Sequence, residues 1–209
     1  MRSWISRRLL FGDYEYIMAE LERESKGDFV AYLRMEPAMF HELLQRMTPR
    51  LSKKDTKWRK ALNPGLRLAV TLRHLATGNS FHSLAFAFRV AHNTISIFVR
   101  EVGEAIIEEY GNEVVSVPTT VNGWQQLSEK FGSRWTFHHT KGAIDGRHIA
   151  IKCQKNLGSV YHNYKGFFSI ILLGVVDASY TFVWVNVEAN ESTSDCRIQQ
   201  IRPQGSVRE

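Results

Sequence analysis

The sequence has only two cysteines, Cys153 and Cys196, and it contains no internal repeat or low-complexity segment. Two such cysteines give neither a disulfide framework nor a zinc-ligand spacing, and they favour a reducing compartment. The longest apolar run, from Ile170 to Val176, is far shorter than the roughly 20 residues that cross a bilayer. We therefore expect a globular protein without membrane association, with one domain or two small ones in 209 residues.

Acidic residues are fewer than basic ones, 21 against 27, which gives a net charge of +6. The excess is concentrated between residues 46 and 73, where the only acid is Asp55. The basic residues there are Arg46, Arg50, Lys53, Lys54, Lys57, Arg59, Lys60, Arg67 and Arg73. Clustered cations of this kind supply the salt-dependent part of nucleic-acid affinity. A phosphate-facing patch and a solvated basic loop both fit this composition.

The hydrophobic pattern divides the chain into a helical part and a strand-rich part. Apolar residues recur at helical spacing from 13 to 48 and from 63 to about 110. From 142 to 189, β-branched and aromatic residues alternate with turn residues, as in strands. Residues 111–141 lie between the two parts and include a short predicted helix at 124–131. The pattern indicates an α+β protein with a helical region at 1–110.

A helix-turn-helix arrangement is predicted within 63–110. A short helix at 81–88 is followed by a tight turn at 89–91 and by a longer helix that begins at His92. The second helix has an apolar face that we expect to point inward: Ile95, Phe98, Val99, Val102 and Ile106. The second helix of such a motif can enter a DNA major groove.

The opposite face of that second helix is polar near its N-terminus. His92, Asn93, Ser96 and Arg100 lie there, and Asn and Arg are residue types that read base edges. A plain helical hairpin in a core is the alternative. Because the basic stretch lies immediately upstream, we favour duplex DNA binding.

A carboxylate interrupts the first apolar strand, "GAIDGRHIAI". Asp145 lies in the middle of this predicted strand, 142–152, and a charge buried there is costly unless it is paired or binds a metal. Gly146 leaves room for a ligand to approach. Two further strands are predicted at 167–176 and 181–187, joined by a short hairpin turn.

A second carboxylate, Asp195, follows the third predicted strand at an expected helix start. Mg²⁺ binds through one or two carboxylates together with substrate phosphates, and a pair of such ions can assist phosphodiester hydrolysis. A turn-forming Asp145 and a helix-capping Asp195 are the structural alternative, and the two residues alone do not decide between them.

Three stretches of the chain resemble the PIF/Harbinger transposase family and its domesticated nucleases. Residues 32–102 are similar to the family's N-terminal region, residues 124–153 to the approach to its first catalytic strand, and residues 161–198 to the segment joining its first two acidic motifs. The resemblance implies a helix-turn-helix followed by an RNase H-like endonuclease domain of the DDE type, occupying residues 142–209 here. The implied activity is divalent-metal-dependent hydrolysis of DNA.

The resemblance assigns roles only where residues match. Asp145, in the Asp-Gly-x-His motif, and Asp195, in the Ser-x-x-Asp motif, are implied as catalytic ligands of Mg²⁺ or Mn²⁺. His148 is expected to support the strand, and Asp177 to form a turn. Lys165, in the Asn-x-Lys-Gly element that includes Tyr161, Asn163 and Gly166, is implied to approach the nucleic-acid backbone.

The resemblance also implies partners and missing parts. Double-stranded DNA, a Myb-like DNA-binding protein and a second copy of the chain are implied partners, in the nucleus or alternatively the cytoplasm. The family completes its site with a later Asp and Glu, whereas this sequence stops at Glu209. Glu191 and Lys141 also depart from the family pattern. We therefore expect a C-terminally truncated, incomplete nuclease domain, with a non-catalytic DNA-binding module as the alternative.

Overall fold

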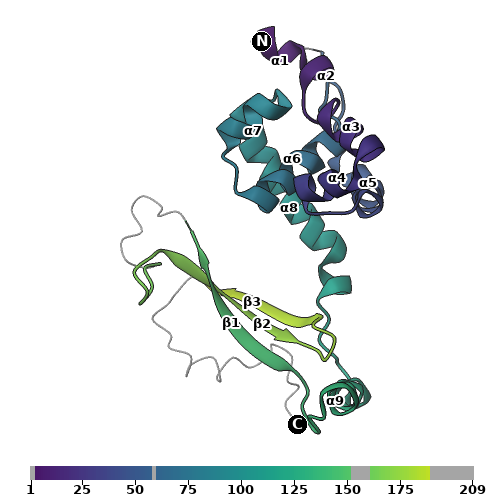
Figure 1. The fold of residues 1–209 in the computed structure, drawn as a ribbon, viewed down its shortest axis with the longest axis vertical. Coiled ribbons are helices and arrows are strands. Elements are labelled where there is room, and N and C mark those ends of the chain that lie inside the picture. Colours follow the sequence, from purple (N-terminus) through teal and green to yellow (C-terminus); the bar gives the residue numbers. More distant parts are fainter. Residues whose placement is uncertain (1–2, 58–59, 152–160, 189–209) are drawn as a thin grey trace. The chain divides into compact units, whose positions relative to one another are not determined.

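The computed structural model describes residues 3–57, 60–151 and 161–188. The chain divides into two compact units, residues 1–111 and 112–209. Figure 1 shows helices throughout the first unit and a small sheet in the second. The mixed α+β composition expected from the sequence is confirmed.

The first unit is built from short helices followed by one long helix. Their bounds are α1 Ser3–Ser6, α2 Arg8–Phe11, α3 Ile17–Glu24, α4 Lys26–Leu33, α5 Pro37–Leu51, α6 Pro64–Thr77, α7 Phe81–Phe88 and α8 His92–Val114. No described helix is long and apolar enough to cross a membrane.

Local capping residues set the ends of α6 and α7. The Asn63 side chain accepts a hydrogen bond from the Gly65 amide at 2.8 Å, and Pro64 occupies the first turn of α6. Gly78 ends α6 in the left-handed conformation, at φ 68°. Ser80 then caps α7 by accepting from the Ser83 amide at 3.2 Å. The bounds of α7 are those predicted from the sequence, 81–88.

Helix α6 is the centre of the helical core and packs against α4, α5 and α7. Its residues 65–71 are all buried, including the polar Arg67 and Thr71. Gly65 is required by close approach, because a Cβ atom there would lie 2.0 Å from the Tyr14 hydroxyl. The largest fully buried side chains around α6 include Phe29 and Phe88.

The second unit contains α9 (Val121–Trp135) and three strands, β1 (Ala143–Ala150), β2 (Ser169–Val176) and β3 (Phe182–Glu188). Helix α9 is longer than the predicted 124–131, because Thr120 caps it by accepting from the Gly123 amide at 3.1 Å. In Figure 1, α9 lies at the end of the sheet where β1 begins. The Trp135 indole N–H there donates to the Ala178 carbonyl at 2.9 Å.

The sheet has the order β1-β2-β3, and both pairings are antiparallel. The expectation that Asp145 lies on a buried strand is not met within the described residues, where β2 is central and β1 is an edge strand. All residues of β1 are exposed except the half-buried His148. Hydrophobic composition suggested burial, but no described element besides β2 pairs with β1.

Candidate functional site

The α7–turn–α8 segment forms as the sequence predicts, with a three-residue turn at 89–91 between helices of the expected bounds. The inward face of α8 is anchored by Ile95, Phe98 and Val102, which are buried. Val99 and Ile106 are partly buried and pack on the same core. The core contacts thus fix which side of α8 faces outward.

The outward side at the start of α8 carries the polar residues that the sequence singled out. His92, Asn93, Ser96 and Arg100 are all exposed. The Ser96 hydroxyl donates to the Asn93 carbonyl at 2.9 Å, so it is held against its own helix. Ile97 is also exposed, at 61%, and sequence analysis missed it. Because a Thr or Ala methyl can contact a thymine methyl group, an exposed aliphatic side chain here is compatible with base contact.

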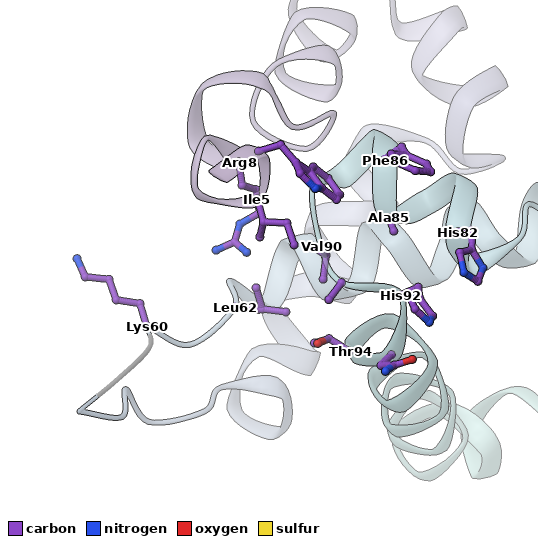
Figure 2. Close-up of a pocket in the computed structure, with 13 residues that line it drawn as sticks. Ile5, Arg8, Lys60, Leu62, His82, Ala85, Phe86, Val90, His92 and Thr94 are labelled. Atoms are coloured by element: carbon purple, nitrogen blue, oxygen red, sulfur yellow. The ribbon is translucent and has the colours of Figure 1, made fainter. Parts of the chain in front are cut away.

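A pocket of about 560 Å³ opens beside the first turn of α8. Figure 2 shows that it is bounded by Ile5 and Arg8 of the N-terminal segment, by Phe86 of α7 and by His92 of α8. Lys60 extends from its outer side. Two aromatic stacks line it: the Trp4 and Phe86 ring centroids are 5.6 Å apart, and the His82 and His92 centroids are 4.2 Å apart. Cationic and aromatic groups therefore gather where the polar helix face begins.

Arg89 joins the turn to the N-terminal segment. Its guanidinium donates to the carbonyls of Phe11 and Trp4, both at 3.0 Å. Its backbone is left-handed, at φ 51°, which is uncommon for a residue other than glycine. One turn residue therefore ends α7 and also holds the segment that forms one wall of the pocket. No periodic pattern in the sequence predicts this contact, which joins residues far apart in the chain.

Much of the basic stretch at 46–73 is engaged within the first unit. Arg46 and Arg50 contact Glu109, and Arg50 also donates to Glu108 at 2.6 Å. Arg73 donates to the Tyr32 carbonyl and stacks on its ring. These cations hold α5 and α6 against the rest of the unit, so only part of the stretch is available to phosphates.

Among the described residues of this stretch the most buried cation is Arg67, whose guanidinium donates to the Leu51 carbonyl at 2.6 Å and to the Glu101 carboxylate. Lys53 donates to the same carboxylate at 2.8 Å. The hydrogen bond from Lys53, opposed by burial and helped by the charges of Lys53 and Arg67, lowers the pKa of Glu101. Burial lowers the pKa of Arg67, and Glu101 opposes that shift. A phosphate-facing role does not fit this buried arginine.

Asp145 lies in the middle of β1 with an exposed side chain. Its Oδ1 accepts the amide of Gly146 at 2.8 Å, and it lies opposite Gly174 in the register. The alternative interpretation of Asp145 as a turn residue is therefore wrong. Because Gly174 has no side chain, the ring of Phe182 can lie next to it, close to the position opposite Asp145.

A hydrogen-bond network on β1 and β2 explains two residues of the resemblance. His148 Nδ1 lies 3.1 Å from the Ser169 hydroxyl, and Asn163 donates to the same hydroxyl at 2.9 Å. Asn163 is buried, and its Oδ1 accepts from the amides of Lys165 and Phe167. His148 therefore supports the strand as expected, and Asn163 shapes the turn that exposes Lys165.

The metal site implied by the resemblance is not assembled within the described residues. Asp195 lies outside them, as does Glu191, so the structure does not test whether Asp145 and Asp195 meet. Across residues 3–57, 60–151 and 161–188, no three His, Cys, Asp or Glu side chains come together as metal ligands. Asp177, by contrast, is the turn residue that was expected, because its Oδ1 accepts from the Ser179 and Thr181 amides at 2.8 and 2.9 Å.

Sequence comparison finds mammalian relatives whose names describe them as nucleases. Over 147 residues the chain is 24% identical to proteins named "Putative nuclease HARBI1" in Homo sapiens, Rattus norvegicus and Bos taurus. The matched stretch covers 70% of this chain and 42% of each relative. The chain thus spans about two fifths of the length of the curated relatives it matches.

No family model matches the chain. No solved structure matches it significantly either. The relationship therefore rests on the residues shared with the mammalian proteins.

Proposed function

We propose that the chain acts on DNA as part of a Harbinger transposase-derived endonuclease. The observation that carries this proposal is the similarity to nuclease-named relatives together with the exposed Asp145 on β1. In this proposal the three-stranded sheet is the first part of an RNase H-like domain, and Asp145 and Asp195 bind a divalent cation, Mg²⁺ or Mn²⁺. The reaction is hydrolysis of a DNA phosphodiester.

The described residues do not by themselves form a complete metal site. Their contribution is positional. Asp145 is held on a regular strand by its pairing to Gly174 of β2, and its exposed carboxylate accepts a hydrogen bond from the Gly146 amide. A single exposed carboxylate of this kind can supply one ligand, and a catalytic site needs others.

The decisive experiment measures cleavage by the full chain. Supercoiled plasmid is incubated with Mg²⁺ or Mn²⁺, and wild type is compared with Asp145→Asn. We expect wild type to nick the plasmid and the variant to lose at least about 100-fold in rate, because a ligand is replaced by a neutral amide. Glu129→Gln on α9, an exposed acid with no assigned role, is the matched control and should cut normally. Equal cutting by Asp145→Asn would contradict the proposal.

A second candidate function is DNA binding without catalysis, through the outward face of α8. It is favoured by the exposure of His92, Asn93, Ser96 and Arg100 on a helix whose opposite face is fixed in the core. In this form the protein holds duplex DNA and leaves cleavage to other chains. If the wild-type chain binds duplex DNA but does not cut it, the result supports this second function over the endonuclease.

Binding is tested with one charge removed at a time. Arg100→Ala should weaken duplex binding and reduce the slope of log affinity against log salt by about one, because one phosphate contact is lost. Arg23→Ala is the matched control: its side chain is 74% exposed and carries the same charge, but it lies on α3. Equal effects of the two variants would mean that α8 does not contact the DNA.

A further inference from the structure

We propose that the second unit binds an unpaired nucleobase in an aromatic pocket close to Asp145. This inference rests on the proposed action on DNA and adds a substrate feature to it, a base outside the double helix. The pocket has a volume of about 440 Å³ and lies between the C-terminal end of α9 and the turn joining β2 to β3. No role was assigned to it from the sequence.

The pocket is lined by aromatic rings that face solvent instead of the core. Trp135, Phe137 and Tyr180 are 40%, 66% and 68% exposed, whereas Phe131 beneath them is buried. Large apolar rings exposed together are unusual and mark a binding surface. Every base has a π-face, and stacking on such rings is a general mode of binding unpaired nucleotides.

Hydrogen bonds hold the Trp135 ring and the turn that carries Tyr180 in place. The Trp135 indole N–H donates to the Ala178 carbonyl, and its ring packs edge-on to Tyr180 with centroids 5.8 Å apart. Asp177 closes the turn that carries Tyr180 by accepting from the Ser179 and Thr181 amides. A preorganised site binds more tightly because less freedom is lost on binding.

Backbone strain is concentrated around the same pocket. Thr136, His139 and Tyr180 have positive φ values of 58°, 65° and 64°. A β-branched or bulky residue in this conformation is uncommon. Strain of this kind persists at binding sites, where the surrounding structure holds a side chain in a required position. Here it places the Tyr180 ring at the rim.

Charge at the rim selects an anionic ligand. The Arg134 guanidinium lies 5.7 Å from the centroid of the Trp135 ring and donates to the Ser179 hydroxyl. Lys141 is exposed and stands between the pocket residues Thr140 and Gly142. The one carboxylate in the lining, Asp177, is engaged by backbone amides. Aromatic rings with nearby cations fit a base that carries its phosphates.

The position of the pocket along β1 connects it to Asp145. Ala143 lines the pocket, and Asp145 is two residues further along the same strand. Because side chains alternate between the faces of a strand, both project from the same face, about 7 Å apart along it. A base held in the pocket would therefore bring its own backbone towards the carboxylate.

The test compares two labelled hairpin DNAs, one fully paired and one with a single unpaired base, by fluorescence anisotropy in the absence of metal. Wild type should prefer the unpaired-base probe. Phe137→Ala should lower the affinity for that probe about tenfold, because one stacking surface is lost, and should change the affinity for the paired probe by less than about twofold. Tyr16→Ala, an aromatic residue 62% exposed on the first unit, is the matched control and should change neither.

Tyr180→Gly separates binding from folding. Glycine accepts the positive φ of this position, so the variant should keep its thermal stability while losing affinity for the unpaired base. Equal affinity of wild type for both probes would overturn this inference but not the proposed action on DNA. Absence of binding to either probe would overturn the proposed action on DNA as well. The same variants are also tested with a labelled acidic peptide. If Phe137→Ala weakens binding of the peptide but not of the unpaired-base probe, the pocket binds protein and the inference is overturned.

Discussion

Asp145 on β1 and Gly174 on β2 are directly paired across the sheet, and the ring of Phe182 lies next to the glycine. A Cβ atom at position 174 would be 2.7 Å from the nearest carbon of that ring. The absence of a side chain at Gly174 thus lets an aromatic ring from β3 lie beside the position opposite the carboxylate. The identity of residue 174 therefore determines where the Phe182 ring can pack.

Gly174→Ala should destabilise the second unit by up to about 1 kcal/mol, because the Phe182 ring, which is 43% exposed, must turn outward to admit the new methyl group. Phe182→Leu in the same chain should recover part of this loss. A double-mutant cycle by chemical denaturation, followed through exchange of the β2 amides, measures the coupling. Simple additivity of the two changes would mean that the ring does not meet the alanine.

Glu101→Gln should destabilise the first unit by about 1–3 kcal/mol at neutral pH. The neutral amide leaves the buried Arg67 guanidinium without its carboxylate partner, and an unpaired buried charge is costly. Thermal unfolding of the full chain measures the change. Glu104→Gln, an exposed acid on the same helix, should be nearly neutral.

The same carboxylate makes stability depend on pH. Its pKa is lowered in the folded chain from the ordinary value of 4.5, first by the hydrogen bond from Lys53. An unfolded chain therefore binds this proton more readily, so the contribution is complete above the unfolded pKa and is lost as pH falls through the folded pKa. Acid titration should show this loss in wild type, and Glu101→Gln should show less of it.

Asn163→Ala should destabilise the second unit by about 2 kcal/mol, because it leaves the amides of Lys165 and Phe167 and the Ser169 hydroxyl short of a partner. Asn163→Asp keeps the accepting oxygens and should cost less. Hydrogen exchange at the two amides reports the change directly. Identical exchange rates in the Ala and Asp variants would show that the accepting oxygen of residue 163 does not protect these amides.

Arg89→Gly should loosen the N-terminal segment while leaving α7 and α8 intact. Glycine tolerates the left-handed backbone, but the two hydrogen bonds to the Phe11 and Trp4 carbonyls are lost. Limited proteolysis should cut residues 3–11 faster. Arg89→Lys keeps the charge but lacks the forked donors, so it should also speed proteolysis of residues 3–11.

The helix boundaries of the first unit could be read from the sequence because local signals set them. Asn63, Gly78 and Ser80 act within a few residues of their own positions, and the apolar repeat of α8 predicted its buried face. The tether of Arg89 and the ion pair of Arg67 with Glu101 join residues far apart in the chain. Composition gave their charge but not their partners.

The sheet was harder to predict for the same reason. The strand positions followed from local residue types, but whether β1 has one neighbour or two depends on elements elsewhere in the chain. The aromatic pocket was missed because its rings come from α9, from the segment after it and from a hairpin turn. Asp195 lies outside the described residues, and its pairing with Asp145 stays a prediction.

Helix α8 has two sides with separate partners, and this has a consequence for how the protein can diversify. Glu101, Glu108 and Glu109 hold the cations of the basic stretch, whereas Asn93 and Arg100 face outward without core contacts. In a saturation library of this helix, tolerated substitutions should fall into two interleaved classes. Outward positions should vary independently of one another, while Glu101, Glu108 and Glu109 should change only together with Arg46, Arg50 and Arg67.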